Sequence, residues 1–364
     1  MASDGVSGRH RVAVIGLGKL GLLFVERLAR RSDMDLVGVV DISPGKVGLA
    51  LDDVAGHPTG FDLIVQDSVE AIASADVALV ATASRLHAVS GLVEQLSRLG
   101  IHTVSTCEEL AYPWREFPNE SRRLDEVARS HGVSVVGCGS NPGFLMDLLP
   151  IVFAFGCERV DSISIERTLD MRPHRRERLT RFGLGLTREE FDALEARPTG
   201  HVGFTQSIDC VADALGWQLD RRVESEVRPA VYATEPRSGH HVTLEPGTVA
   251  VIEHSACGYR EGEKAIWLTS YFGFHDDDDA IFHGDVYTIG ASDHPIRIEM
   301  APSWSPFTGT PSTVVNMVGP IQAADPGLRC VTDFPAKSLA SSGRGVATQS
   351  PLPIDDYLVL SGHR

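Results

Sequence analysis

The sequence predicts an α/β protein with a doubly wound parallel sheet, followed by a second α+β domain built on a mixed or antiparallel sheet. From Arg11 to about Gly143, short apolar runs alternate with helical patterns, which is typical of a parallel sheet with helices on both faces. After Pro150, β-branched and alternating runs predominate, as in a sheet with one solvated face. The 364 residues are enough for two domains.

The first domain's elements follow from runs of apolar residues and the polar turns between them. Its expected strands are residues 12–15, 36–40, 76–82, 102–105 and 134–136, and its expected helices are 22–30, 89–99 and 120–131.

In the second half, strands are expected at 159–167, 248–254, 265–272 and 295–300. A helix at 187–197 is predicted by Thr187 with Glu190 three residues later, a capping-box pattern. A helix at 204–215 ends at Gly216. A last helix at 310–324, interrupted at Gly319 and Pro320, is expected to return to the first domain. The expected divisions are 10–143, 144–309 and 310–364, with a loop or loosely held tail at 336–353.

A glycine-rich turn follows the first strand: Gly16, Leu17, Gly18, Lys19, Leu20 and Gly21. Gly16 suits a tight turn, Gly18 lets a pyrophosphate approach the backbone, and Gly21 lets the next helix sit close to the strand. Asp41 ends the second strand about twenty residues later, where a carboxylate accepts a ribose hydroxyl. The pattern predicts a Rossmann-type site for NAD or NADP. Asp41 slightly favours NAD, although Lys19 and Lys46 soften its repulsion of a 2′-phosphate.

The net charge and the spacing of cysteines and acidic residues exclude several classes of function. The net charge of −16 argues against a nucleic-acid partner or an anionic membrane surface. The six cysteines show no paired or metal-binding spacing, and we find no signal or membrane segment, so a cytoplasmic protein is expected. The four aspartates Asp276 to Asp279 favour a solvated turn over a metal site, and no metal is predicted.

Three loops at the carboxyl edge of the parallel sheet should face the ligand crevice. After the third strand, Thr82, Ala83 and Ser84 are expected to line the cofactor, unless they form only a polar turn that caps a helix. After the fourth, Glu108 and Glu109 stand among apolar residues, which favours partly buried carboxylates that hold a cationic nitrogen or move a proton. Helix capping is the alternative.

Aromatic and amide side chains complete the expected pocket. Tyr112 and Trp114 come from the fourth loop, and Asn141, Phe144 and Met146 come from the glycine-rich turn after the fifth strand. Asn141 is expected to contact the nicotinamide carboxamide or the substrate, and the other four to form apolar walls. The turn could instead be only a rigid hinge between domains.

Four segments together carry a family resemblance. They are Gly16–Gly21, Ser105–Trp114, Gly139–Asp147 and Gly200–Phe204. The chain resembles the 2,4-diaminopentanoate dehydrogenase family and its amine dehydrogenase relatives, which share the two-domain plan of dihydrodipicolinate reductase. The resemblance implies that Glu108 or Glu109 handles the amine nitrogen.

The resemblance also implies that Arg167 and His201 lie near the substrate. From the sequence alone, Arg167 could equally be a surface or ion-paired group, and His201 a residue at the start of a helix. Dihydrodipicolinate reductase activity itself is disfavoured, because no lysine follows His240 and His241.

The functional hypothesis is an NAD(P)-dependent amine dehydrogenase that interconverts a small amine with its ketone or aldehyde plus ammonia. One alternative is an imine or carbonyl reductase acting on a preformed double bond. Another is a dinucleotide-sensing protein without turnover. A homodimer is expected, because an open sheet in the second domain can pair across a two-fold axis.

Overall fold

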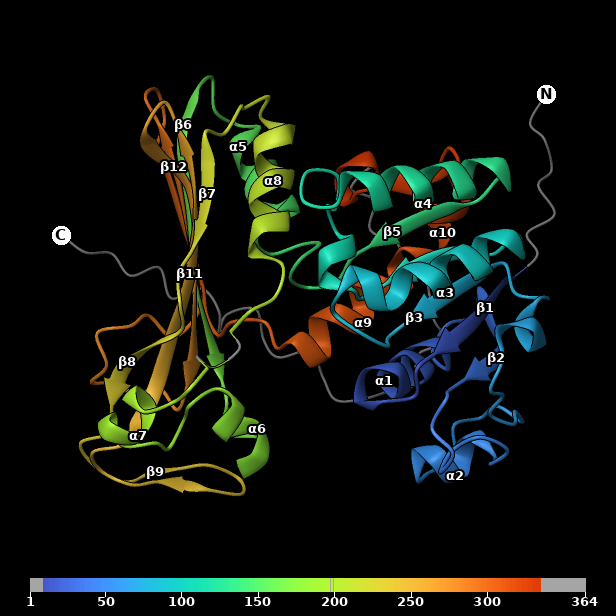
Figure 1. Ribbon diagram of the computed structural model, residues 1–364, viewed down its shortest axis with the longest axis horizontal. Helices are drawn as coiled ribbons and strands as arrows, with labels where there is room; N and C mark the ends of the chain where they lie inside the picture. The colour runs from blue at the N-terminus through green and yellow to red at the C-terminus, as the bar shows by residue number, and fades with distance from the viewer. Residues whose placement is uncertain (1–8, 197, 199, 335–364) are drawn as a thin grey trace.

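The computed structural model describes residues 9–196, 198 and 200–334, which form two sheets joined side by side (Figure 1). The first sheet has six parallel strands in the order β15-β5-β4-β3-β1-β2. Their bounds are β1 His10–Ile15, β2 Met34–Val40, β3 Val77–Val80, β4 His102–Ser105, β5 Ser134–Gly137 and β15 Gly327–Arg329. The strand order reverses between β1 and β3, the point where α/β sheets bind ligands.

Helices cover both faces of this sheet. On one face α1 (Lys19–Leu28) packs against α9 (Pro306–Asn316) and α10 (Val318–Ala323), and on the other α3 (Leu86–Arg98) packs against α4 (Pro118–Ser130). The short α2 (Leu51–Ala55) follows β2. Each helix buries its apolar side against strands with no exposed side chains, such as β3, so both faces of the sheet are core.

The second sheet is mixed, with the order β14-β13-β6-β12-β11-β7 and β8 also pairing with β11. Only the β6–β12 pair is parallel among its described pairings. The bounds are β6 Val160–Asp170, β7 Arg221–Glu224, β8 Arg228–Tyr232, β11 Val249–Arg260, β12 Glu263–Gly273, β13 Asp285–Ala291 and β14 Ile296–Met300, and a separate pair is formed by β9 Arg237–Ser238 and β10 Thr243–Leu244.

Two helices, α5 (Leu148–Ala154) and α8 (Phe204–Ala214), pack on the face of the second sheet that is turned toward the first sheet (Figure 1). Two shorter helices, α6 (Arg176–Arg181) and α7 (Arg188–Asp192), lie near one end of the sheet. The predicted fold class, a parallel sheet followed by a mixed one, is therefore confirmed.

Some boundaries differ from expectation. The capping box at Thr187 and Glu190 is present, but α7 ends at Asp192 because only one turn packs, through Phe191, onto the core. The final helix is divided at Met317, not at Gly319 and Pro320, and α10 contains both of those residues. Strand β13 was not predicted. The predicted tail at 336–353 lies outside the described residues.

The chain crosses between the sheets twice, once after β5 and once before α9. At the crossing, the rings of Phe144 and Trp304 stack with centroids 5.5 Å apart. Ser140 is linked to Thr310 of α9 by two hydrogen bonds, of 3.1 Å from its backbone N–H and 2.9 Å between hydroxyls. The two connections are therefore tied to each other.

The described residues bear on the expectations about membrane segments and cysteines. None of their helices is both long and apolar enough to cross a membrane. The six cysteines are all described, and each is a free thiol.

Candidate active site

A cleft of about 1320 Å³ opens where the carboxyl edge of the first sheet meets the second sheet. Nine predicted site residues line it: Lys19, Leu20, Thr82, Ala83, Ser84, Glu108, Asn141, Arg167 and His201. The structure thus brings together residues from the glycine turn, all three predicted loops and the second sheet.

The glycine turn has the geometry that a dinucleotide requires. Gly16 has φ of +87°, which favours glycine, and a Cβ on Gly21 would lie 1.9 Å from the carbonyl oxygen of Gly16. In contrast, no atom lies within 4 Å of a Cβ built on Gly18, the residue that precedes α1. The space beside Gly18 at the helix N-terminus therefore fits a pyrophosphate.

Asp41 lies at the end of β2 and is 8% exposed. Its Oδ2 accepts hydrogen bonds from Leu17 N–H at 2.8 Å and Lys46 Nζ at 2.9 Å, and its Oδ1 accepts from Ser43 N–H at 2.8 Å. Burial raises the pKa of Asp41, but Lys46 and the two N–H donors lower it more, so the group is a carboxylate at neutral pH. Asp41 also holds the glycine turn in place through Leu17.

The adjacent glutamates Glu108 and Glu109 have different environments. Both lie in the short 3₁₀ helix η2 (Glu108–Leu110) after β4, but only Glu108 lines the cleft. Burial raises its pKa, while a hydrogen bond with Ser84 and the charge of Arg85 oppose the rise. A carboxyl group with a raised pKa beside the sheet's ligand crevice can take up and release protons.

Glu109 points away from the cleft. Its carboxylate accepts a 2.6 Å bond from Arg85 Nη1 and a 2.7 Å bond from Leu86 N–H at the start of α3. This is the helix-capping alternative, so Glu109 stabilises α3 and is not available to a ligand in the cleft.

Asn141 and His201 contact each other at the cleft wall. Asn141 Nδ2 lies 3.1 Å from His201 Nε2 and 3.2 Å from Met146 Sδ, whereas Asn141 Oδ1 is buried without a partner. Burial lowers the pKa of His201 to about 3, with Arg167 and His254 adding to the effect. The imidazole is therefore neutral and its Nε2 accepts from the Asn141 amide.

A buried acceptor without a partner is costly, so Asn141 Oδ1 is suited to a donor from a ligand. A carboxamide N–H or a substrate ammonium would satisfy it. Behind it, His201 N–H donates to His254 Nδ1 at 3.0 Å, and His254 Nε2 lies 3.1 Å from Glu224 Oε1. This chain of contacts fixes Asn141 from the second sheet.

Two glycines allow the loops to meet. Gly203 has φ of +100°, and a Cβ there would lie 2.5 Å from Pro142 Cγ and 3.1 Å from Glu108 Cβ. A Cβ on Gly200 would lie 2.3 Å from His254 Nδ1. The segment 200–204 therefore packs directly against both Glu108 and the turn that contains Asn141. Side chains larger than hydrogen at Gly200 and Gly203 would prevent this packing.

Arg167 lines the cleft from β6 but is only 2% exposed. Its Nε donates to Asp285 Oδ1 at 2.9 Å, and its Nη2 donates to Ser303 Oγ at 3.1 Å and to the Trp304 carbonyl at 3.2 Å. The guanidinium therefore fixes the second crossing of the chain as well as part of the cleft wall.

Four predicted pocket walls are not among the residues that line the cleft. Tyr112 packs on the first core and hydrogen bonds with Asp213, and Trp114 packs beside α3 and α4. Phe144 stacks on Trp304, and Met146 is fully buried in the second core. Each belongs to a loop whose apolar residues anchor it to the core, and the polar residues of those loops face the cleft.

Four basic residues at and just before α6 line the cleft, although no sequence pattern associated them with the site. Arg175, Arg178, Arg181 and the preceding His174 all line the cleft. None of these three arginines forms an ion pair among the described residues. The basic stretch from Arg172 to Arg181 is visible in the sequence, but only the fold shows that it faces the glycine turn.

The fold and this cleft define a nicotinamide-dinucleotide-dependent oxidoreductase. The profile of the 2,4-diaminopentanoate dehydrogenase C-terminal domain matches residues 144–347. The chain is 32% identical over 332 residues to 2,4-diaminopentanoate dehydrogenase of Acetoanaerobium sticklandii, covering 89% of this chain and 93% of that protein. The chain belongs to the 2,4-diaminopentanoate dehydrogenase family. It is accordingly an NAD(P)-dependent oxidoreductase that acts on CH–NH₂ groups.

Solved structures support the fold. An amine dehydrogenase from Mycobacterium smegmatis superposes with a TM-score of 0.74 at 22% identity, covering 90% of this chain and 96% of that one. A probable dehydrogenase from Thermotoga maritima superposes with a TM-score of 0.53 at 14% identity, covering 89% and 92%. Both likenesses concern the overall fold of the two-domain chain.

Proposed function

We propose that this enzyme oxidises the amine of a small amino acid to its ketone and ammonia, and catalyses the reverse reductive amination, with Glu108 as the catalytic carboxylate. The observation that carries this assignment is the pairing of Glu108 with the unpartnered Asn141 Oδ1 on one wall of the cleft. Together they offer a proton-transfer group and an acceptor for a nitrogen-bound hydrogen.

When bound, the nicotinamide ring accepts or supplies a hydride at the carbon that bears nitrogen. Glu108, as a carboxylate, stabilises the cationic iminium and takes or returns the proton as water adds or leaves. Asn141 Oδ1 orients an N–H of the ligand, and the neutral His201 holds Asn141 in position. The cleft also contributes to the rate by holding the substrate close to the nicotinamide ring and by limiting the access of water.

We propose that the substrate carries a carboxylate. The relative from Acetoanaerobium sticklandii is a 2,4-diaminopentanoate dehydrogenase, and its substrate combines amines with a carboxylate. In this chain, the exposed arginines of α6 supply positive charge to the cleft without ion-paired partners among the described residues. Arginine binds planar carboxylates well.

For the cofactor we favour NAD over NADP. Asp41 ends β2, where Rossmann-type sites bind the ribose hydroxyls, and among the described residues its Oδ1 accepts a hydrogen bond from Ser43 N–H alone, which leaves room for another donor. A 2′-phosphate would meet this charge, although Lys46 partly offsets it. Initial rates with NADH and NADPH at equal concentration test the preference.

We also propose a cytoplasmic homodimer. The six free thiols suit a reducing compartment. The face of the second sheet that bears neither α5 nor α8 exposes parts of Trp267, Cys257 and Tyr259, which a second copy could cover. The mass in solution, measured by light scattering during size-exclusion chromatography, tests the dimer.

The decisive activity experiment measures oxidation of NADH and NADPH with a panel of small keto acids and ketones, with and without ammonium. Turnover that requires ammonium and is fastest with keto acids supports the proposal. Turnover without ammonium favours the imine or carbonyl reductase. Tight cofactor binding without any turnover favours the sensing protein.

A further inference from the structure

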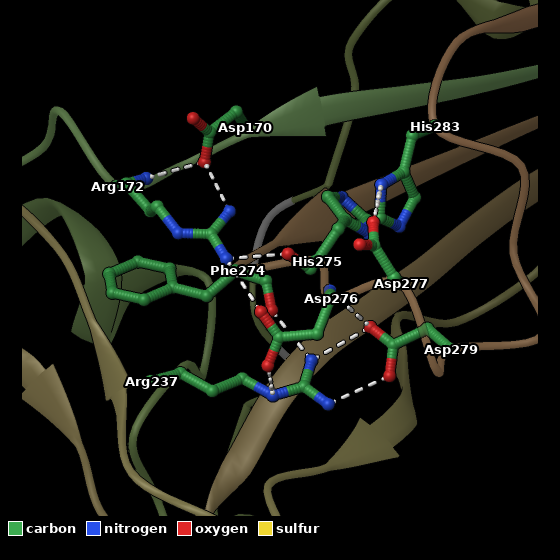
Figure 2. Close-up of polar contacts among 9 residues, drawn as sticks. All are labelled: Asp170, Arg172, Arg237, Phe274, His275, Asp276, Asp277, Asp279 and His283. Atoms are coloured by element: carbon green, nitrogen blue, oxygen red, sulfur yellow. Dashed lines mark hydrogen bonds and ion pairs between the residues drawn. The ribbon is translucent and has the colours of Figure 1, made fainter.

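A cluster of metal-ligating side chains lies outside the cleft, in the loop between β12 and β13. His275, Asp279 and His283 are spaced four residues apart, and their potential ligand atoms all lie within 4.8 Å of one another. None of the three lines the cleft. Figure 2 shows them with the arginines that surround the loop.

The imidazole nitrogens of this cluster lack partners. His275 is 7% exposed, and neither ring nitrogen has a partner within normal hydrogen-bond distance and angle, although the backbone of Leu169 lies beside the ring. His283 Nε2 is also buried without a partner. Buried polar atoms normally find partners, so three such nitrogens in one loop are suited to bind a ligand.

The carboxylate of Asp279, close to these nitrogens, can accept further contacts. Asp279 Oδ2 accepts from Arg237 Nη1 at 2.7 Å and from Asp276 N–H at 3.0 Å, whereas Oδ1 accepts, within the described part of the chain, only from Arg237 Nη2 at 2.7 Å. Asp279 Oδ1 can therefore bind a cation as well. Asp277 and Asp278 are exposed in a turn, as expected for this run of aspartates, but the side chain of Asp279 is buried against Arg237, which the sequence did not predict.

Charge and orientation also fit a cation. The guanidinium groups of Arg172 and Arg237 form ion pairs with Asp170, Asp276 and Asp279, and the carboxylate of Asp277 lies beside His283 (Figure 2). Two guanidinium groups and four carboxylates leave a net charge of −2. Asp277 Oδ1 lies 4.0 Å from His283 Nδ1. A carboxylate on that side favours a proton on Nδ1, which leaves the lone pair of the buried Nε2 free for a ligand.

We propose that His275, Asp279 and His283 bind one Zn²⁺ ion. Two imidazoles and one carboxylate suit zinc, whereas Mg²⁺ and Ca²⁺ prefer sites made of oxygen atoms. Zinc bonds of about 2.0–2.1 Å require donor atoms roughly 3.3 Å apart, so binding would draw together ligand atoms that now lie within 4.8 Å of one another. Water completes the coordination.

The proposed ion has a structural role. Arg172 donates to the His275 carbonyl and to Asp276 Oδ1, and the next residues, Pro173 to Arg175, line the cleft. Zinc would therefore fix the loop that supports the segment leading into α6. It takes no part in the amine chemistry, so its test does not depend on the proposed function.

The test uses the full chain without an affinity tag, stripped with a chelator and then titrated with Zn²⁺ alone. We expect one zinc per chain by calorimetry and by elemental analysis after gel filtration, and a melting temperature that rises by several degrees. His283→Gln should weaken zinc binding at least tenfold. The matched control His294→Gln changes an exposed histidine of the same sheet and should bind zinc as the parent does.

Three results would overturn the proposal: no stoichiometric zinc in the parent chain, equal affinity in His283→Gln, or an equal loss in His294→Gln. The visible spectrum of the Co²⁺-loaded parent chain needs no variant. Absorption bands of a four- or five-coordinate nitrogen and oxygen site are expected, and a spectrum identical to that of Co²⁺ in water would contradict the site.

Discussion

The two walls of the cleft are built in different ways. On the first-sheet wall, the glycine turn reaches the cleft through Lys19 and Leu20, and Asp41 holds that turn through Leu17. Both come from one continuous β–α–β segment, and both oxygens of Asp41 already accept protein hydrogen bonds. On the second-sheet wall, Arg167, the arginines of α6 and His201 come from separate elements, and the α6 arginines have no ion-paired partner among the described residues. The first wall is therefore preorganised for the dinucleotide cofactor, whereas the arginines of the second wall keep free donors for a particular substrate.

Glu108 lies where these walls meet, and its removal should have the largest effect. Glu108→Gln keeps the shape but removes the charge and the transferable proton, so kcat should fall by about 10²- to 10⁴-fold while the Kd of NADH stays unchanged. Steady-state kinetics and cofactor fluorescence measure the two quantities.

Glu109→Gln is the matched control. It weakens the contacts with Arg85 and Leu86, so it should lower the melting temperature while kcat of the folded enzyme stays within about threefold of the parent. Equal losses of kcat in both variants would refute the division of roles between the two glutamates.

The pH profile sharpens the same comparison. Because burial raises the pKa of Glu108, the carboxylate is lost on acidification at a higher pH than an ordinary glutamate would require. The rate of reductive amination at saturating ammonium should therefore fall up to tenfold per pH unit below that pKa. Glu108→Gln should abolish this acidic limb, and a limb that persists in the variant assigns it to another group.

The first wall can be tested at two glycines. Gly18→Ala should leave the melting temperature of the free enzyme unchanged, because nothing lies near the added methyl group, yet raise the Kd of NADH about tenfold. Gly21→Ala should destabilise the free enzyme by about 1–3 kcal/mol, since its methyl group meets the Gly16 carbonyl. Thermal unfolding and cofactor titration separate the effects, and unchanged affinity in Gly18→Ala would contradict the pyrophosphate position.

The second wall should give the smallest effect. Arg178→Gln should raise the KM of a keto acid about fivefold and leave the KM of NADH unchanged, since one of three neighbouring arginines is lost. Arg176→Gln, on the same helix but not lining the cleft, is the control. An equal rise for an uncharged ketone would exclude carboxylate binding by Arg178.

The sequence was sufficient to predict the first wall, because the roles of Gly16 to Gly21 and Asp41 follow from local backbone geometry. It also placed Glu108 and Asn141 at the carboxyl edge of the sheet. It could not separate Glu108 from Glu109, because adjacent side chains in a 3₁₀ turn point in different directions that depend on packing. Likewise, Tyr112 and Met146 have the composition of a pocket wall but are buried in the cores.

The unpredicted features arise from contacts between distant segments. The arginines of α6 reach the cleft only because β6 crosses the second sheet and ends beside it. Asp279 is buried because Arg237, more than forty residues earlier in the chain, binds both of its oxygens. No local pattern records such partners, so the four aspartates resembled an ordinary solvated turn.

The stacked rings of Phe144 and Trp304 have a mechanical consequence. Because both chain crossings meet at this stack, any opening of the cleft must rotate the two halves about an axis near it. Groups close to that axis, such as Asn141, would then move little, while the arginines of α6 would travel further. Ligands could thus enter and leave at the end of the cleft that carries the arginines of α6, without displacing the side-chain amide of Asn141.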